Sequence, residues 1–170
     1  MVIVPLHNTD HSTDFIWSLL STIPDPEVPV ISIAELGVLR KVEYIDDILM
    51  VTITPTYSGC PAMFAIEDDI KKLLEENNIT NYKIKTVHFP IWTTDWLSNE
   101  AKQKLTAYGI APPQHSAAAK NQRPDEVKVS CPFCHSAETK LTSWFGSTAC
   151  KALYYCNHCE QPFEHFKCHH

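Results

Sequence analysis

The sequence has 170 residues, which fits one domain or two small ones, and 44% of them are apolar, as in an ordinary globular protein. The formal net charge of −6 argues against nucleic acid as the main partner, because phosphate binding needs a basic surface. No apolar run approaches the length of a membrane span, and the short apolar stretch after Met1 lacks the basic residues of a secretory leader. We therefore expect a cytoplasmic protein with no membrane partner.

The first predicted elements are a helix and a proline-rich loop. Apolar residues at helical spacing predict a helix over residues 12–20, with Ser12 or Thr13 as its N-cap. The prolines of segment 24–29 exclude a helix there and force extended backbone. Ser32 is then expected to cap a single helical turn that Gly37 closes.

A hairpin and a second helix follow. Residues 38–45 and 48–54 alternate in polarity as strands do, and Asp46-Asp47 forms the turn between them. The second helix begins after Cys60, with Pro61 at its first helical position.

The pattern predicts a third strand over Tyr82–Phe89 and a third helix from Thr94 to Gly109. Residues 1–110 are therefore expected to form a small α/β domain with a short mixed sheet and flanking helices. Residues 111–126 contain three prolines and almost no large apolar group, so we predict a linker followed by a separate domain over residues 127–170. The predicted fold class is α+β.

The second domain contains two C-x-x-C pairs, which predict a metal site. A tight turn aims both sulfurs of such a pair at one point, and a β-hairpin between the pairs brings the four sulfurs together. Residues 140–145 and 151–155 can supply that hairpin. A closed tetrahedral site of four thiolates suits structural Zn²⁺ or iron, and metal would supply folding energy to a domain of this size. The four ligands are Cys131, Cys134, Cys156 and Cys159.

The remaining residues of this domain leave alternatives open. Cys150 and Cys168 are either core thiols or additional ligands that, with the first four, would offer alternatives for an iron–sulfur cluster. His169 and His170 are either native or the remnant of a tag. His135 follows the first pair, where positive φ is common, so we expect a structural role for it.

Cys60 is the informative residue of the first domain. It is predicted to lie between a strand and the start of a helix, where the helix dipole lowers the pKa of a thiol. It is either a reactive or metal-binding thiolate or a small buried residue. Asp25 and Glu27 on the rigid proline-rich loop either assist such a site or are solvated loop charges.

Three segments of the first domain resemble the iron–sulfur cluster assembly domain of SufT-type proteins. They are Asp25–Pro29, Ile33–Val38 and Thr54–Pro61. Further segments resemble the PaaD family, a component of the bacterial phenylacetyl-CoA epoxidase system. These are Trp92–Trp96, Tyr108–Pro113, Phe145–Ala152 and Phe163–Cys168.

The resemblance implies a non-catalytic accessory role in aerobic phenylacetate degradation. The protein would assist maturation of an iron–sulfur or diiron centre, with the oxygenase and reductase subunits of the epoxidase as partners. Cys60 matches the motif cysteine of the family and Asp25 its DPE aspartate. Together with Glu27 they form the candidate transient site for iron or a cluster, which two protomers of a homodimer could share.

Two other hypotheses remain. The protein could be a structural or electron-transfer subunit of the oxygenase that carries its own metal cluster among the six cysteines after residue 130. It could also be a thiol enzyme with Cys60 as nucleophile, although no base is evident beside Cys60 in the sequence.

Overall fold

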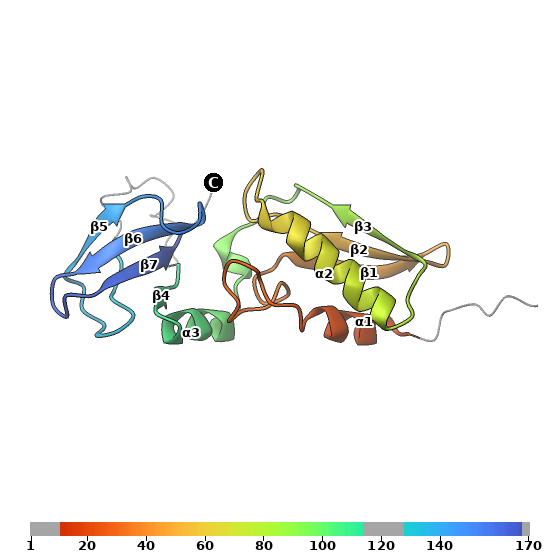
Figure 1. Cartoon of the computed structure of the whole chain (residues 1–170), viewed down its shortest axis with the longest axis horizontal. Helices are drawn as coiled ribbons and strands as arrows, with labels where there is room; N and C mark the ends of the chain where they lie inside the picture. Colours follow the sequence, from red (N-terminus) through yellow and green to blue (C-terminus); the bar gives the residue numbers. More distant parts are fainter. Residues whose placement is uncertain (1–10, 114–127, 168–170) are drawn as a thin grey trace, which may run out of the picture. The chain divides into compact units, whose positions relative to one another are not determined.

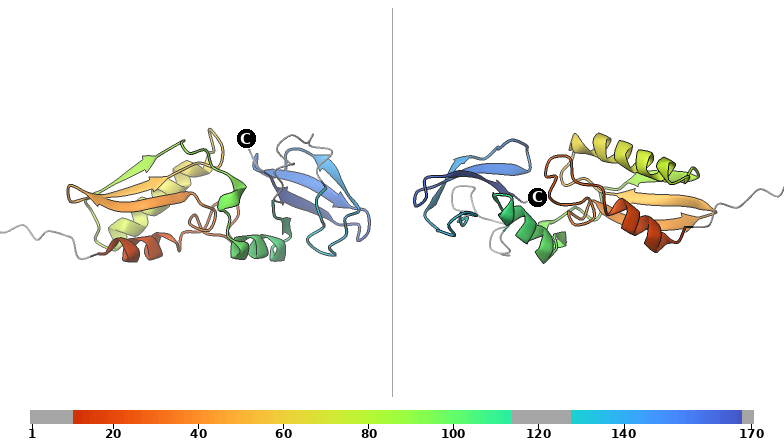
Figure 2. Two further views of the ribbon diagram at one scale, coloured as in Figure 1. Left: turned by 180° about the vertical axis from the view of Figure 1, so that it is seen from behind. Right: turned by 60° about the horizontal axis from the view of Figure 1, so that its bottom comes forward.

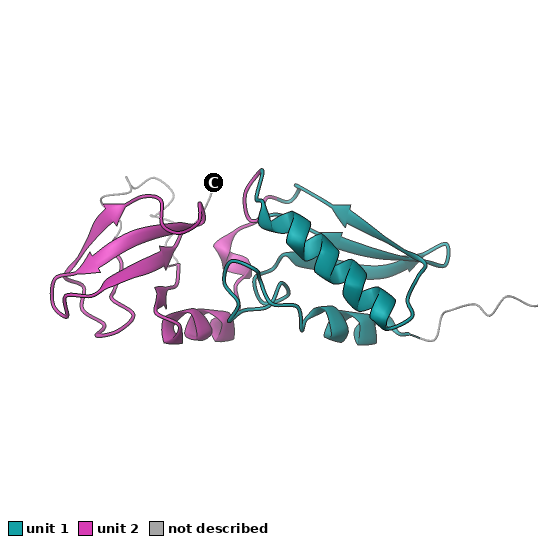
Figure 3. Ribbon diagram, in the orientation of Figure 1, with its two compact units in different colours: residues 1–55, 59–90 teal, residues 56–58, 91–170 magenta. Residues whose placement is uncertain are grey.

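The computed structural model describes residues 11–113 and 128–167. Within this part the chain forms two compact units (Figure 3). Unit 1 comprises residues 11–55 and 59–90, and unit 2 comprises residues 56–58, 91–113 and 128–167. None of the helices in these ranges has the length and apolar character that a bilayer crossing requires.

Unit 1 is a three-stranded mixed sheet with two helices (Figure 1). Its elements are α1 (Thr13–Leu20), β1 (Leu39–Ile45), β2 (Ile48–Ile53), α2 (Ala62–Glu76) and β3 (Tyr82–Thr86). β1 and β2 are antiparallel around Asp46 and Asp47, whose φ angles of 50° and 61° suit a tight hairpin turn. β2 and β3 are parallel, and α2 is the crossover between them.

The core of unit 1 follows from the periodicity of its elements. Leu49, Val51 and Ile53 alternate along β2 and are fully buried. Ile66 and Ile70 recur at helical spacing along the buried side of α2, which runs beside the sheet (Figure 2). The amphipathic pattern seen in the sequence is therefore the pattern of burial.

The segment before β1 is held by local hydrogen bonds. The N-cap expected for the first helix is confirmed: the Phe15 N–H donates to Ser12 Oγ at 3.2 Å. Ser32 and Glu35 form a capping box, in which the Glu35 N–H donates to Ser32 Oγ and the Ser32 N–H donates to the Glu35 carboxylate. Gly37 follows with φ of 77°, as expected for a residue that closes a turn.

Among the predicted boundaries that differ from the structure are those of the third strand and of the second and third helices. β3 ends at Thr86 rather than at Phe89, because β2, its partner strand, ends at Ile53. Pro61 occupies the N-cap of α2, one residue before the predicted position. The predicted third helix is divided at Ser98, whose hydroxyl caps a new helix by accepting from the Ala101 N–H at 3.0 Å.

Unit 2 contains a four-stranded sheet in the order β4-β7-β6-β5. Its elements are η1 (Thr94–Trp96), α3 (Asn99–Ala107), β4 (Ile110–Ala111), β5 (Thr139–Ser143), β6 (Lys151–Cys156) and β7 (Pro162–Phe166). β5, β6 and β7 form an antiparallel ribbon, and β4 joins β7 in parallel. The core residues include Val129, Tyr154 and Phe163, with both buried cysteines of the C-x-x-C pairs.

The predicted domain boundary at residue 110 differs from the division into units. Residues 91–113 group with the ribbon, because Ile110 and Ala111 pair with Glu164 and His165 of β7. Trp92 is buried and meets Phe166 edge to face, with ring centroids 6.1 Å apart. Ala111, the first residue of the predicted linker, is thus a buried strand residue, while residues 114–126 lie outside the described part.

Candidate metal centre and helix-terminal cysteine

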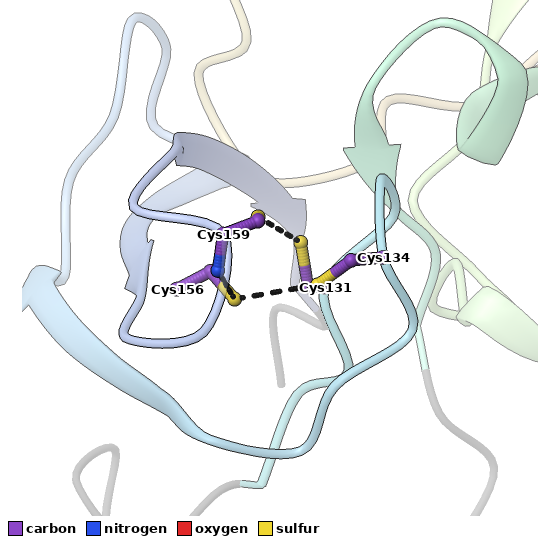
Figure 4. A group of neighbouring side chains, drawn as sticks. All are labelled: Cys131, Cys134, Cys156 and Cys159. Carbon is purple, nitrogen blue, oxygen red and sulfur yellow. Dashed lines mark hydrogen bonds between the residues drawn. The ribbon is translucent and has the colours of Figure 1, made fainter.

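Four thiols of the ribbon converge on one point (Figure 4). The sulfurs of Cys131, Cys134, Cys156 and Cys159 all lie within 4.8 Å of one another. The sulfur of Cys131 is 3.6 Å from that of Cys159, and the sulfur of Cys134 is 3.6 Å from that of Cys156. A tetrahedron with Zn–S bonds of about 2.3 Å has sulfur–sulfur edges of about 3.8 Å, so the donor set fits Zn²⁺ in type, number and spacing.

The two C-x-x-C loops have the same backbone geometry. The Cys131 N–H donates to Ser136 O at 2.9 Å, and the Cys156 N–H donates to Gln161 O at 3.0 Å. Each loop then needs a residue with positive φ directly after its second cysteine. His135 has φ of 61° and Glu160 has φ of 57°, so the structural role expected of His135 agrees with its conformation.

The electrostatics of the four thiols favour a bound cation. The backbone N–H of Cys159 donates to the Cys156 sulfur at 3.5 Å and lowers the pKa of Cys156 to about 7. Burial, together with hydrogen bonds to the three other thiols, raises the pKa of Cys159 to about 12. Neighbouring thiols therefore resist simultaneous ionisation, and a divalent metal would supply the charge that allows all four to be thiolates. A closed site of four sulfurs leaves no open position for substrate.

Two buried lysines outside the cluster of four thiols make polar contacts within the ribbon. Lys151 is buried, and its ammonium lies 3.0 Å from a carboxylate oxygen of Glu164, whose other oxygen accepts from the Ser147 N–H at 2.7 Å. Lys167 is also buried. Its ammonium donates to the Trp144 carbonyl and lies 4.4 Å from the ring centroids of Trp144 and Phe145.

The structure keeps Cys150 apart from the four clustered thiols. Cys150 is buried, and its sulfur lies 3.0 Å from Thr148 Oγ1. Among the described residues it belongs to no group of three or more side chains that could share a metal ion. Cys168, the other candidate for an additional ligand, lies outside the described residues, as do His169 and His170.

Cys60 lies at the carboxyl-terminal edge of the parallel strand pair in unit 1. It follows β2 and precedes α2, and its carbonyl accepts from the Met63 N–H in the first turn of that helix. Its side chain is 8% exposed, close to the surface but largely covered. Gly59 beside it has φ of 81°, and apart from its two chain neighbours no residue has an atom within 4 Å of where a Cβ would stand. A helix start at the end of parallel strands is a common ligand position in α/β folds.

The two carboxylates of the proline-rich loop are placed differently. Asp25 is buried, and its Oδ1 accepts from the backbone N–H groups of Glu27 at 3.0 Å and Val28 at 2.8 Å. Asp25 therefore fixes the conformation of the loop. Glu27 is half-buried. In the described part of the chain, neither carboxylate shares a potential metal-binding group with Cys60.

Several residues escaped the sequence analysis. Thr54 directly follows β2, and its hydroxyl is the one buried side-chain polar atom of the described residues that has no hydrogen-bond partner. The sequence offered one indication that Thr54 matters, namely that it is the first residue of the motif Thr54–Pro61. The burial of Lys151 and Lys167 had no signal, because exposed lysines are the rule.

Comparison with known proteins finds two family matches, in separate segments of the chain. Residues 13–80 match the family described as iron–sulfur cluster assembly protein, and residues 115–167 match the PaaD zinc beta ribbon domain. Part of this chain has a fold similar to that of a solved structure from Bacillus anthracis described as a domain of unknown function, DUF59. The TM-score is 0.51 at 28% identity, covering 55% of this chain and 90% of that one.

Two curated relatives make the family assignment of the chain more specific. A protein from Escherichia coli, named as a putative subunit of 1,2-phenylacetyl-CoA epoxidase, is 47% identical over 90% of this chain and 91% of its own length. An Fe–S protein maturation auxiliary factor from Porphyromonas gingivalis is 36% identical over 51% of this chain and 84% of its own. The protein thus combines an iron–sulfur assembly domain with a zinc ribbon. It belongs to the PaaD family, together with the Escherichia coli relative.

Proposed function

We propose that this protein is an accessory maturation factor of a phenylacetyl-CoA epoxidase, in which Cys60 transiently holds iron or an iron–sulfur cluster for delivery to a client subunit. The ribbon holds a structural Zn²⁺ through its four clustered cysteines. The protein itself performs no catalytic turnover, and its cargo is the metal centre that the client receives.

The position of Cys60 carries this proposal. A thiol at the start of α2 benefits from the positive end of the helix dipole, which favours the thiolate that binds iron. Its slight exposure and the open space beside Gly59 allow a partner to approach closely. The match of residues 13–80 to iron–sulfur assembly proteins supports the same role.

The four-thiol cluster and Cys60 differ in their number of potential ligands, which supports different roles for the two sites. Four converging sulfurs make a closed site that retains its metal, whereas Cys60 shares no three-residue ligand group within the described residues. A carrier must release what it binds, and fewer protein ligands make release easier. Asp25 then acts by fixing the loop that it caps, since its Oδ1 already accepts two backbone hydrogen bonds.

Metal analysis of anaerobically purified protein tests the proposal, with Cys60→Ser beside the wild type. We expect one zinc per chain in both. After reconstitution with ferrous iron and sulfide, only the wild type should show iron with visible absorption. The client subunit from cells carrying Cys60→Ser should lack its iron. Cys150→Ser is the matched control, because Cys150 is likewise a buried thiol outside the zinc group. Full iron occupancy of the client without Cys60 would contradict the role of carrier.

One observation favours a second function, that of an electron-transfer or structural subunit. The Escherichia coli relative is named as a subunit of the epoxidase, and a site of four thiolates also accepts iron. This alternative predicts a visible chromophore that persists in Cys60→Ser and disappears in Cys131→Ser, together with stable co-purification with the oxygenase. A colourless protein with one zinc excludes electron transfer.

A further inference from the structure

The two most exposed large apolar side chains in the described chain are both in unit 1. Phe64 is 78% exposed and Phe89 is 81% exposed. Neither is needed for the core: α2 buries Ala62, Ile66 and Ile70 on its other side. Large apolar side chains that a fold leaves this exposed commonly belong to interaction surfaces.

Both phenylalanines lie at the same edge of the sheet as Cys60. Phe64 is one helical turn beyond Cys60, and its N–H donates to Pro61 O at the start of α2. Thr86, the last residue of β3, donates to the carboxylate of Glu67 in the next turn of that helix at 3.1 Å. The segment that continues to Phe89 therefore leaves β3 beside the first turns of α2, as the views in Figures 1 and 2 show.

The α2 side of this edge carries negative charge, although Lys41 and Lys85 lie near the same end of the sheet. Glu67, Asp68 and Asp69 follow Phe64 before the first basic residue of α2, Lys71. The described residues of unit 1 contain 12 acidic and 6 basic side chains. A second copy of the chain would bring like charge to this edge, which disfavours self-association there. A partner with lysine or arginine around an apolar recess complements both the rings and the carboxylates.

We propose that Phe64 and Phe89 form a docking surface beside Cys60 for the protein that receives the metal centre, and that this protein presents an apolar recess bordered by basic side chains. This inference rests on the proposed function of Cys60 as a carrier. The two aromatic rings would hold the recipient over the thiol, and the carboxylates of α2 would orient it during approach.

Binding of the full-length, zinc-loaded chain to the purified remaining subunits of a phenylacetyl-CoA epoxidase tests this surface. We expect Phe64→Ser and Phe89→Ser each to weaken binding by about tenfold or more, as central aromatic residues of interfaces do. Ile45→Ser is the matched control, because Ile45 is 46% exposed at the hairpin end of the same sheet, away from Cys60. It should change affinity by less than about twofold. Unchanged binding of both phenylalanine variants, an equal loss in Ile45→Ser, or no binding by the wild type would each overturn the surface.

Two further measurements define the partner. The affinity should fall as the salt concentration is raised, and Asp69→Lys should weaken binding. Tighter binding in either case would contradict the proposal that basic side chains border the recess of the partner. Sedimentation of the chain alone should show no self-association that depends on Phe64. A dimer that Phe64→Ser dissociates would assign the surface to a second copy instead.

The Cys60→Ser variant separates this inference from the function on which it rests. It should bind the epoxidase subunits with wild-type affinity while failing to deliver iron. If it delivers iron normally while the phenylalanine variants still lose binding, the carrier role fails and the docking surface stands. If the phenylalanine variants bind normally while Cys60→Ser fails in delivery, the surface fails and the carrier role stands.

Discussion

His165 Nδ1 donates a hydrogen bond to the carbonyl oxygen of Ala111 across 3.1 Å, so a buried imidazole on β7 fastens β4 to the ribbon. The carbonyl can only accept, which places the proton of the neutral ring on Nδ1. The ring of Tyr154 lies edge to face against the imidazole, with centroids 5.7 Å apart. The ribbon therefore contains a buried titratable imidazole, and burial favours its neutral form.

Acid should destabilise the ribbon through His165. Burial lowers the pKa of His165 from 6.5 to about 4, and the nearby Lys167 ammonium acts in the same direction, while the bond to Ala111 opposes them. The unfolded chain then binds the extra proton, so the stabilisation is complete above about pH 6.5 and is lost as the pH falls toward 4. Between pH 7.5 and pH 5 the loss is about 2 kcal/mol.

Urea unfolding of the zinc-saturated protein, followed by circular dichroism, checks this loss. His165→Asn keeps a donor near the Nδ1 position and cannot ionise, so its free energy of unfolding should fall by about 2 kcal/mol less than that of the wild type over the same pH interval. Protonation of the metal ligands affects both proteins alike and cancels in the comparison. Equal losses would mean that His165 does not carry the pH dependence.

The parts of this fold that the sequence predicts are those set by local chemistry. A C-x-x-C turn fixes its two sulfurs within four residues, so the four clustered cysteines and the positive φ of His135 could be inferred without tertiary contacts. The amphipathic helices and the Asp46-Asp47 hairpin turn have equally local signals. The resemblance to assembly domains rested on such short motifs and is confirmed by the family matches.

The missed features depend on contacts between distant residues. β4 has two residues, too few for any periodicity, and exists because Ile110 and Ala111 pair with β7 more than 50 residues later. β7 itself carries polar Glu164 and His165 inside a small domain, which obscures the alternation expected of a strand. Lys151 and Glu164 form their ion pair only in the folded ribbon, so no local sequence pattern predicts their burial.

Removal of zinc should unfold the ribbon and leave unit 1 folded. Unit 1 has its own buried core, whereas the ribbon core includes two of the four clustered cysteines, so we expect its packing to depend on the proposed Zn²⁺. After chelation, amide resonances of β5–β7 should collapse while those of β1–β3 persist. Cys131→Ser should lose its zinc, and Cys150→Ser should retain one zinc per chain. Loss of zinc from Cys150→Ser would place that thiol among the ligands.

Breaking the Lys151–Glu164 pair should cost more than breaking an exposed pair of similar length. Burial opposes ionisation of Glu164, but the Ser147 N–H and Lys151 together hold the pKa of this carboxyl below its usual value. Lys151→Met leaves the carboxylate without its cation, and because Glu164 is 24% exposed we expect a loss of about 2 kcal/mol.

The control for this prediction is Lys41, whose ammonium lies 2.7 Å from Glu43; the side chain of Lys41 is 61% exposed and that of Glu43 is 33% exposed. Lys41→Met should cost less than about 1 kcal/mol. Denaturant unfolding of each variant gives the comparison. If both substitutions cost the same, burial does not strengthen the Lys151–Glu164 pair.

Gly146→Ala should destabilise the ribbon through Glu164. A Cβ at residue 146 would stand 2.8 Å from Glu164 Oε1 and 3.3 Å from backbone and side-chain atoms of Lys151. The carboxylate cannot swing aside without losing the Ser147 N–H and the Lys151 ammonium, so we expect a cost of about 1–2 kcal/mol in the free energy of unfolding. In a Glu164→Ala background the same substitution should cost clearly less, because the closest obstructing atom is gone. An equal cost in the two backgrounds would assign the requirement for glycine to the Lys151 backbone instead.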